Sequence, residues 1–228
     1  MSPAEVGALS LLGAVLGLDV VSFPQAMLSR PLVAATLTGA LLGTPGMGLV
    51  LGVTLECFAL ETLPVGASRY PEWGSSSVVG ASLLGMAPDS RGSALLLAVV
   101  MSLAWAWVGG WSMVQLRRLN ARRARARHEA VAQGTRSAVV ELQLFGMTAD
   151  LARGALMTAI GIVAFAPVVR WALPQWTSNA ALSGAVLMAM AGIIAAAAVH
   201  KVFHLVLHTR WWFAGGIVLG LALLGIVQ

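Results

Sequence analysis

Apolar segments separated by short polar or glycine- and proline-containing breaks run along the whole chain. The clearest is Ala94–Leu116, whose length of about 23 residues exceeds the roughly 20 that a helix needs to cross a bilayer. Three further stretches, Ala155–Leu173, Ala180–Val199 and Trp211–Val227, are also predicted to span the membrane. Two shorter segments, Leu32–Leu42 and Gly46–Leu60, are predicted to be half-helices, re-entrant elements or tilted spans. The short first segment, Val6–Val21, is predicted to be a retained membrane helix, and the small-residue run Gly74–Ala87 is predicted to pack closely against other helices. The pattern predicts an all-α integral membrane protein, a polytopic helical bundle with short, broken or re-entrant helices.

Composition supports lipid as the main solvent of this chain. Of its 228 residues, 58% are hydrophobic and only 10% are charged, whereas a soluble domain carries about 25% charged residues. The net charge of +5 is unevenly distributed, because basic residues concentrate between Arg117 and Arg127. Positive charge next to a membrane-spanning helix favours the cytoplasmic side. No soluble fold accompanies these arginines, so a nucleic-acid-binding function is not expected.

Ionisable residues recur among small and apolar residues between positions 30 and 72. They are Arg30, Glu56, Glu61, Arg69 and Glu72. An ionisable group at membrane depth is costly unless it faces protein or a water-filled cavity, so it is a candidate functional residue. Glycine and proline interrupt the same stretch, and many transporters build their substrate sites from such broken helices. This stretch is therefore predicted to contain a substrate site.

The same stretch resembles a known family of membrane proteins. The strings SRPLVAATLTGALLG and GLVLGVTLECFALETLPVGASRYPEW, and later LQLFGMTADLARGALMTAIG, are similar to the IIC subunit of the mannose/fructose/sorbose-family sugar phosphotransferase system. The resemblance implies a single IIC-like membrane domain over residues 1–228, in the bacterial inner membrane. It also implies a IID membrane partner, cytosolic IIA and IIB subunits, and inward movement of a hexose. The phosphoryl group travels on IIA and IIB, so a non-catalytic permease subunit without cofactor or metal is expected.

Several polar residues are candidates for contact with a substrate. Glu56 lies in an apolar run and could accept two sugar hydroxyls, or it could form a structural ion pair with Arg30. Glu61 is expected to cap or pair more than to bind, and Asp19 could bind a hydroxyl, cap the next segment or mark the interface. The predicted substrate-binding set is Asp19, Glu56, Glu61, Ser68 and Arg69. Glu72 is interpreted as a solvated loop residue in preference to a gate.

The middle of the chain is predicted to lie at the cytoplasmic surface. Residues from about 117 to 153 are expected to form a basic loop followed by an interfacial helix. The simplest role of Arg117–Arg127 is to orient the protein and contact anionic lipids, and docking of a cytosolic subunit such as IIB is the alternative. His200, His204 and His208 share one helical face, where an interfacial cluster is favoured over a metal site.

Two functions from different classes fit these observations. The first is a sugar-translocating subunit of a phosphotransferase system. The second is a non-transporting membrane scaffold or regulatory subunit that retains the IIC fold, which the scarcity of amide side chains and tyrosine favours. A membrane-embedded enzyme is disfavoured, because no nucleophile and base or zinc-binding set stands out.

Overall fold

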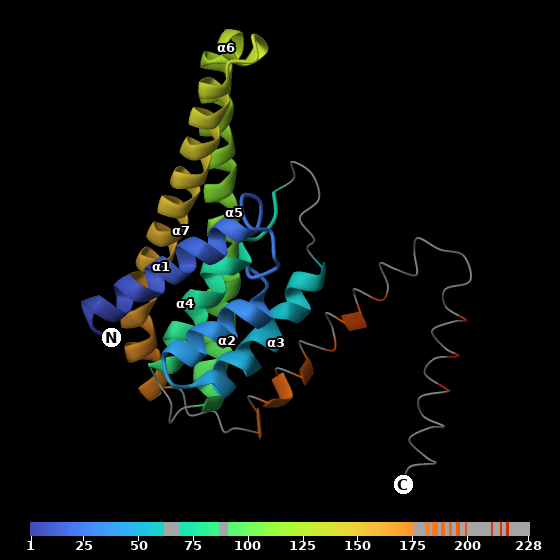
Figure 1. Cartoon of the computed structure of the whole chain (residues 1–228). Coiled ribbons are helices and arrows are strands. Elements are labelled where there is room, and N and C mark those ends of the chain that lie inside the picture. The colour runs from blue at the N-terminus through green and yellow to red at the C-terminus, as the bar shows by residue number, and fades with distance from the viewer. Residues whose placement is uncertain are drawn as a thin grey trace.

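The computed structural model describes residues 1–61, 69–86 and 91–175 continuously, and a few separate positions between 181 and 218. Every regular element within these ranges is helical, which confirms the all-α prediction (Figure 1). The elements in chain order are α1 (Pro3–Asp19), α2 (Pro31–Leu41), α3 (Pro45–Glu61), α4 (Trp73–Gly85), α5 (Arg91–Ala126), α6 (His128–Ala132), α7 (Arg136–Ala172) and the short 3-10 helix η1 (Leu173–Gln175).

Local sequence signals set the starts of the first helices. The Ser2 hydroxyl accepts the Glu5 N–H at 3.2 Å, and the Ser2 N–H donates to a Glu5 carboxylate oxygen at 2.6 Å. This reciprocal capping box satisfies two N–H groups that have no partner within the helix. Pro31 and Pro45 each open a helix, where the missing proline N–H costs nothing. The break around residue 44 therefore ends α2 and begins α3.

Helices α2 and α3 form a tight antiparallel hairpin. Gly43 closes the turn with φ +75°, a conformation that glycine adopts without steric cost. A Cβ on Gly39 would lie 2.9 Å from the Gly48 Cα, and a Cβ on Gly52 would lie 2.9 Å from the Pro31 carbonyl oxygen. The two backbones are thus in direct contact. With 11 and 17 residues, the helices are about 17 and 26 Å long, so neither crosses a hydrocarbon core of about 30 Å at full length.

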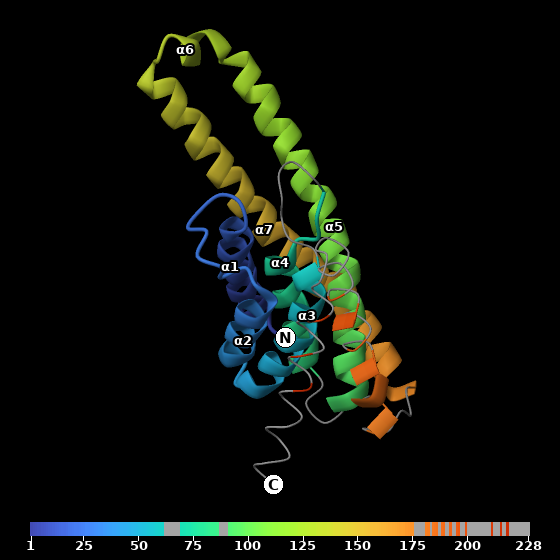
Figure 2. The same cartoon turned by 90° about the vertical axis from the view of Figure 1, so that its right-hand side faces the viewer.

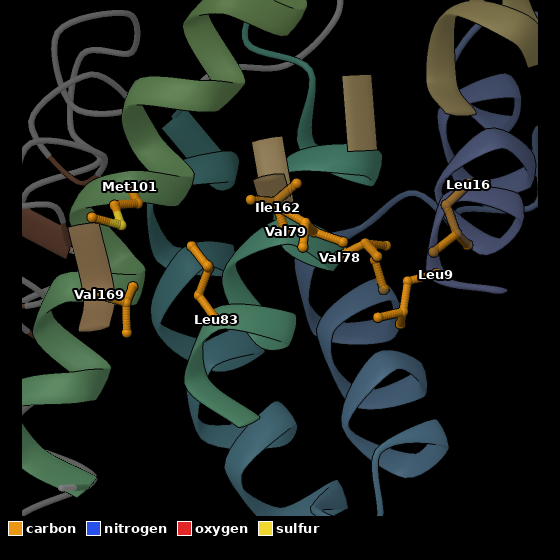
Figure 3. Packing of buried hydrophobic residues seen from close by; sticks show 9 residues of the cluster. Leu9, Leu16, Val78, Val79, Leu83, Met101, Ile162 and Val169 are labelled. Carbon is orange, nitrogen blue, oxygen red and sulfur yellow. The ribbon is translucent and has the colours of Figure 1, made fainter. Parts of the chain in front are cut away.

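Helix α4 lies at the centre of the bundle. It contacts α1, α2, α3, α5 and α7, and its residues from Gly74 to Leu84 are all buried. Serine and glycine dominate its first half, and small side chains let neighbouring helices approach closely in a membrane. Figure 3 shows one apolar cluster that joins these helices. The residues labelled there are Leu9 and Leu16 of α1, Val78, Val79 and Leu83 of α4, Met101 of α5, and Ile162 and Val169 of α7.

Helices α5 and α7 are much longer than the rest and extend beyond the bundle as a two-helix arm with α6 at its tip (Figures 1 and 2). They contain 36 and 37 residues. Their apolar parts, within Gly92–Ala126 and Arg136–Gln175, are long enough to cross a membrane. The indole N–H of Trp105 donates to the Met157 carbonyl at 3.0 Å and so joins the two helices inside the bundle.

The arm differs from the expected basic loop and interfacial helix at about 117–153. Helix α5 continues through the arginines to Ala126, and α7 runs unbroken from Arg136 past Pro167 to Ala172. The amphipathic stretch and the apolar span are therefore one helix. Arginine is a good helix former, so the loss of apolar character after Leu116 ends the membrane-crossing part without ending the helix.

The outer surface of the bundle is apolar. Exposed large side chains include Trp107 and Trp111 of α5, Leu156 and Val163 of α7, and Val53 of α3. A soluble monomer rarely exposes so much contiguous apolar surface. Lipid or other membrane-embedded protein must cover these side chains.

Candidate functional site

Asp19 lies at the end of α1 and organises the segment that follows. Its side chain is 2% exposed, and its two carboxylate oxygens accept the backbone N–H groups of Ala26 at 2.7 Å and Ser29 at 2.9 Å. These contacts hold a segment in which Gln25 and Met27 have positive φ. A carboxylate has about four acceptor positions, so Asp19 retains acceptor capacity beyond this loop-holding role.

Glu56 closes the open end of the α2–α3 hairpin. One of its oxygens lies 2.5 Å from Arg30 Nη2, and the other accepts the Leu32 N–H at 3.1 Å. The ion pair considered for Glu56 and Arg30 is therefore present. A negative charge at a helix N-terminus is also favoured by the helix dipole. The side chains of Arg30 and Glu56 are 28% and 17% exposed, so the pair remains partly accessible.

The remaining candidates do not join these two carboxylates within the described residues. Glu61 is the last residue of α3, but its side chain lies outside the described part, as does all of Ser68. Arg69 is exposed, and its guanidinium lies 6.0 Å from the centre of the Trp107 ring. The histidine row at 200, 204 and 208 also falls outside the described residues.

Glu72 is fully buried, so its interpretation as a solvated loop residue is wrong. It is 0% exposed and forms the N-cap of α4, where its carboxylate accepts both the N–H and the hydroxyl of Ser75. Its own N–H donates to the Ala106 carbonyl of α5 at 2.8 Å. Gly109 makes this approach possible, since a Cβ there would lie 2.9 Å from the Glu72 Cβ. Glutamate is not among the preferred N-cap residues, so the sequence gives no usual signal for this cap.

Asp150 and Arg153 of α7 form a second buried charged group that the sequence analysis placed in an interfacial helix. Arg153 Nε donates to Asp150 Oδ1 at 2.9 Å, and Asp150 Oδ2 accepts the Ser22 hydroxyl at 2.7 Å. Arg153 Nη1 donates to the Ser112 hydroxyl of α5 at 3.2 Å. The side chains of Arg153 and Asp150 are 9% and 1% exposed. In the sequence, this buried pair was indicated only by two opposite charges three residues apart, followed by Gly154.

Glu72 and Arg153 face the same small space above Gly17 of α1. A Cβ on Gly17 would lie 3.4 Å from Arg153 Nη2 and 3.8 Å from Glu72 Oε1. The two side chains form no ion pair with each other, and Arg153 Nη2 makes no hydrogen bond, although it lies 2.9 Å from Asp150 Oδ1. We call Glu72, Ser75, Ser112, Asp150 and Arg153 the polar centre. It brings together α4, α5 and α7 beside α1 and carries a formal charge of −1.

The polar centre lies within the membrane-crossing part of α5. Its contacts on that helix are Gly109 and Ser112, which precede Arg117 by eight and five residues. At 1.5 Å per residue these positions are about 12 and 8 Å from the arginine that starts the basic segment. The polar centre is thus inside the apolar layer, toward its basic end, where uncompensated charge is costly.

A groove between α5 and α7 reaches the polar centre. It has a volume of about 720 Å³ and opens on the apolar outer surface of the bundle, because the exposed Leu156 lines it together with Leu116, Phe145, Ser112 and Arg153. Sites for small molecules typically have volumes of about 300 to 1,000 Å³, apolar walls and a few polar groups. The carboxylates can accept hydroxyl hydrogen bonds, and the guanidinium can donate them. The arrangement suits a neutral polyhydroxylated ligand.

These features define a multi-pass integral membrane protein with a buried polar site, and comparison with known sequences specifies its family. The family model described as the sorbose-specific IIC component of the phosphotransferase system matches residues 5–197. The chain belongs to this family, as its sequence resemblance predicted. It is 34% identical over 104 residues to the fructose permease IIC component of Bacillus subtilis (strain 168), a match that covers 46% of this chain and 38% of that protein.

Other relatives match over similarly limited lengths. Identity is 35% over 75 residues to the mannose-specific EIIC component of Escherichia coli (strain K12), which covers 33% of this chain and 28% of that protein. It is 29% over 104 residues to the sorbose-specific EIIC component of Klebsiella pneumoniae, covering 46% and 39%. The aligned part of this chain thus spans less than half the length of each relative.

Solved structures share the fold. One described as the structure of a membrane protein has a TM-score of 0.75 at 19% identity, covering 100% of this chain and 92% of that chain. The cryo-EM structure of the mannose transporter ManYZ in complex with microcin E492 has a TM-score of 0.59 at 21% identity, with the same coverage. Family and fold together confirm the expected integral membrane protein of the bacterial inner membrane.

Proposed function

We propose that this chain is the sugar-translocating IIC subunit of a phosphotransferase system and that it moves a hexose across the inner membrane. A IID membrane subunit and cytosolic IIA and IIB subunits would complete the system. The observation that carries the proposal is the polar centre, in which Arg153 pairs with Asp150 while the buried Glu72, which faces the same space, has no cationic partner among the described residues. Buried charges normally pair fully, so an incompletely paired arrangement at membrane depth favours a ligand-binding role over a purely structural one.

Hexose hydroxyls match the hydrogen-bonding groups of this space. Arg153 Nη2 lies 2.9 Å from Asp150 Oδ1 but makes no hydrogen bond, so it offers an N–H donor. Glu72 offers acceptor capacity beyond its contacts with Ser75. Hydrogen bonds to charged groups contribute about 1.5–3 kcal/mol each. The α5–α7 groove supplies the adjoining volume. We assign the first sugar contacts to Glu72 and Arg153.

The candidate residues predicted from the sequence are proposed to make additional contacts with the sugar. Asp19 and Glu56 keep free acceptor positions while they hold the segment after α1 and the start of α2. We propose that they contact the sugar, with Arg30 orienting Glu56. Contacts from Glu61, Ser68 and Arg69 are proposed on their sequence positions alone. Anionic lipids would bind at the membrane end of Arg117–Arg127, where Arg117 follows the apolar part of α5.

The proposal is tested by phosphoenolpyruvate-dependent hexose uptake in cells that carry the complete IIA, IIB, IIC and IID set. Arg153→Gln and Glu72→Gln should each lower uptake at least about tenfold, the equivalent of one lost charge-assisted hydrogen bond. Asp19→Asn and Glu56→Gln should have smaller effects. The matched control is Arg170→Gln, which removes an exposed arginine from the same helix as Arg153.

Two outcomes would contradict different parts of the proposal. Normal uptake by both Arg153→Gln and Glu72→Gln, at equal amounts of protein in the membrane, would rule out the polar centre as the sugar site. Absence of uptake of every hexose by the unaltered set would rule out transport itself.

A non-transporting scaffold remains the second candidate function. The observation that favours it is that Asp19 and Glu56, the most prominent carboxylates of the sequence, both bond to the backbone of this chain. In that case the chain would assemble with IID, and neither protein would support uptake or bind a hexose. Copurification with IID combined with hexose-binding calorimetry separates the two functions.

A further inference from the structure

The arm carries its charge well past the apolar layer. Helix α5 contains 36 residues and is therefore about 54 Å long, against about 30 Å of hydrocarbon. The arm and its tip α6 stand clear of the other described helices in both views (Figures 1 and 2). Residues 121–129 and 131–137 are all exposed. In the described structure, this segment is therefore accessible to molecules beyond the membrane surface.

The arginines of the arm divide between two faces. Arg123 and Arg127 turn toward α7, where both contact Glu141, at 3.6 and 2.9 Å. The Arg123 guanidinium also stacks 4.0 Å from the centre of the Phe145 ring. These two arginines are therefore engaged within the arm and help to hold its helices together.

Three other arginines lie on a different face of α5. Arg118, Arg122 and Arg125 are spaced i, i+4 and i+7, which places them along one side of a helix. All three are exposed. Within the described part of the chain no carboxylate forms an ion pair with them. We call them the outer arginine stripe, a row about 10 Å long.

The position of this stripe favours a protein over a lipid surface. Arg122 and Arg125 are five and eight residues beyond Arg117, or about 8 and 12 Å along the helix axis. The headgroup region adds only about 5–8 Å to each side of the hydrocarbon. The tip also lacks the continuous apolar face with which interfacial helices enter lipid, since Val131 is its only large exposed aliphatic side chain between Arg122 and Arg136. The outer end of the stripe therefore lies in water.

We propose that the outer arginine stripe docks an acidic surface of a soluble cytosolic protein. This inference rests on the proposed function, which supplies such a partner in the phosphoryl-carrying IIB subunit. Complementary charge steers association and fixes orientation. Arg122 lies ten residues, or about 15 Å along α5, from Ser112 of the polar centre. A partner docked on the stripe would thus be held near the cytosolic end of the α5–α7 groove, where a transported hexose would emerge.

The test measures association of purified IIB of the same system with the full-length chain, reconstituted with its IID subunit in nanodiscs. Arg118→Gln with Arg122→Gln should slow association about tenfold at low salt, and the difference should disappear near 0.5 M salt. The matched control is Arg123→Gln with Arg127→Gln, which removes the same charge at the same spacing from the inner face. The control should retain association, with thermal unfolding reporting any loosening of the arm.

Unchanged association in the Arg118 and Arg122 double variant would overturn the proposal. So would a result in which that variant loses only its binding to vesicles containing phosphatidylglycerol, because the stripe would then serve lipid. Hexose binding is measured separately without IIB. If the unaltered complex binds no hexose, the proposed function fails. If it binds hexose and the stripe variant associates normally, the docking inference alone fails.

Discussion

Glycine determines how closely the charged side chains of the polar centre approach their neighbours. Gly17 leaves open the space that Glu72 and Arg153 both face, and Gly109 lets the segment carrying Glu72 lie against α5. The charge and hydrophobicity pattern of the sequence does not reveal the role of either glycine. The ionisable residues supply the chemistry, and the absent side chain at Gly17 leaves a space of about one methyl group beside them.

Filling the space above Gly17 should therefore impair the proposed binding of a hexose without unfolding the protein. The methyl group of Gly17→Ala would lie 3.4 Å from Arg153 Nη2 and 3.8 Å from Glu72 Oε1, which is ordinary contact distance. Alanine also favours a helix by up to about 1 kcal/mol over glycine. We expect hexose affinity to fall about tenfold or more, as measured by calorimetry, while the melting temperature holds or rises.

Gly7→Ala is the matched control on the same helix, because a Cβ there meets no atom within 4 Å. It should leave affinity unchanged. Equal affinity of the Gly17→Ala and unaltered proteins would place the ligand elsewhere than the polar centre.

The sequence made some charged residues conspicuous and concealed others. Asp19 and Glu56 stand out because each lies within or at the end of an apolar run, and the structure places both in specific contacts. Glu72 and Asp150 lie next to polar stretches, so their burial is invisible locally. It depends on contacts such as that between Ser22 and Asp150, which are 128 positions apart. Only the assembled bundle brings these residues together.

Among the helices, the α2–α3 hairpin shows how far backbone contact can replace side-chain packing. Its glycines place two helices closer than any larger residue would permit, and the Arg30–Glu56 pair holds the open end. The glycine-proline break and the short helices were predictable, because both follow from local conformational preference. The unbroken course of α7 was not, since its change from amphipathic to apolar imitates a boundary between two elements.

A methyl group at the hairpin contact should destabilise the fold. A Cβ on Gly48 would collide with the Ala35 carbonyl oxygen, so Gly48→Ala must separate the two backbones. Overpacking of this kind typically costs about 1–3 kcal/mol. We expect a lower midpoint of heat-induced unfolding in detergent, followed by tryptophan fluorescence. Gly46→Ala, in the same hairpin with no atom within 4 Å of its Cβ, should unfold at or above the normal temperature, and equal loss in both would contradict close packing as the cause.

The molecule as a whole is polarised between an apolar bundle and a basic arm. Exposed large apolar side chains lie on α3, α5 and α7 of the bundle, while the arginines of 117–127 lie on the arm, which extends from one end of the bundle (Figure 2). Positive charge next to a span is retained on the cytoplasmic side. The charge distribution therefore assigns an orientation to a bundle whose helices alone do not specify one.

Labelling from the two sides of the membrane tests this orientation. In a Cys57→Ser background, Ala124→Cys should react with a membrane-impermeant maleimide only after the cells are permeabilised. Gln175→Cys, at the opposite end of the α7 and η1 segment, should react in intact cells. Both positions are exposed. The reverse pattern would place the arm outside the cytosol and remove its access to a cytosolic partner.

Helix α7 runs without a break from the tip of the arm to the polar centre and beyond. This one helix carries both Glu141, which contacts two arginines of α5, and Arg153 of the polar centre. The two residues are twelve positions apart. One inserted residue would turn the two ends by about 100° relative to each other, whereas seven would nearly restore their alignment. Natural variants of this chain should therefore tolerate length changes at α6 far more readily than between these two positions.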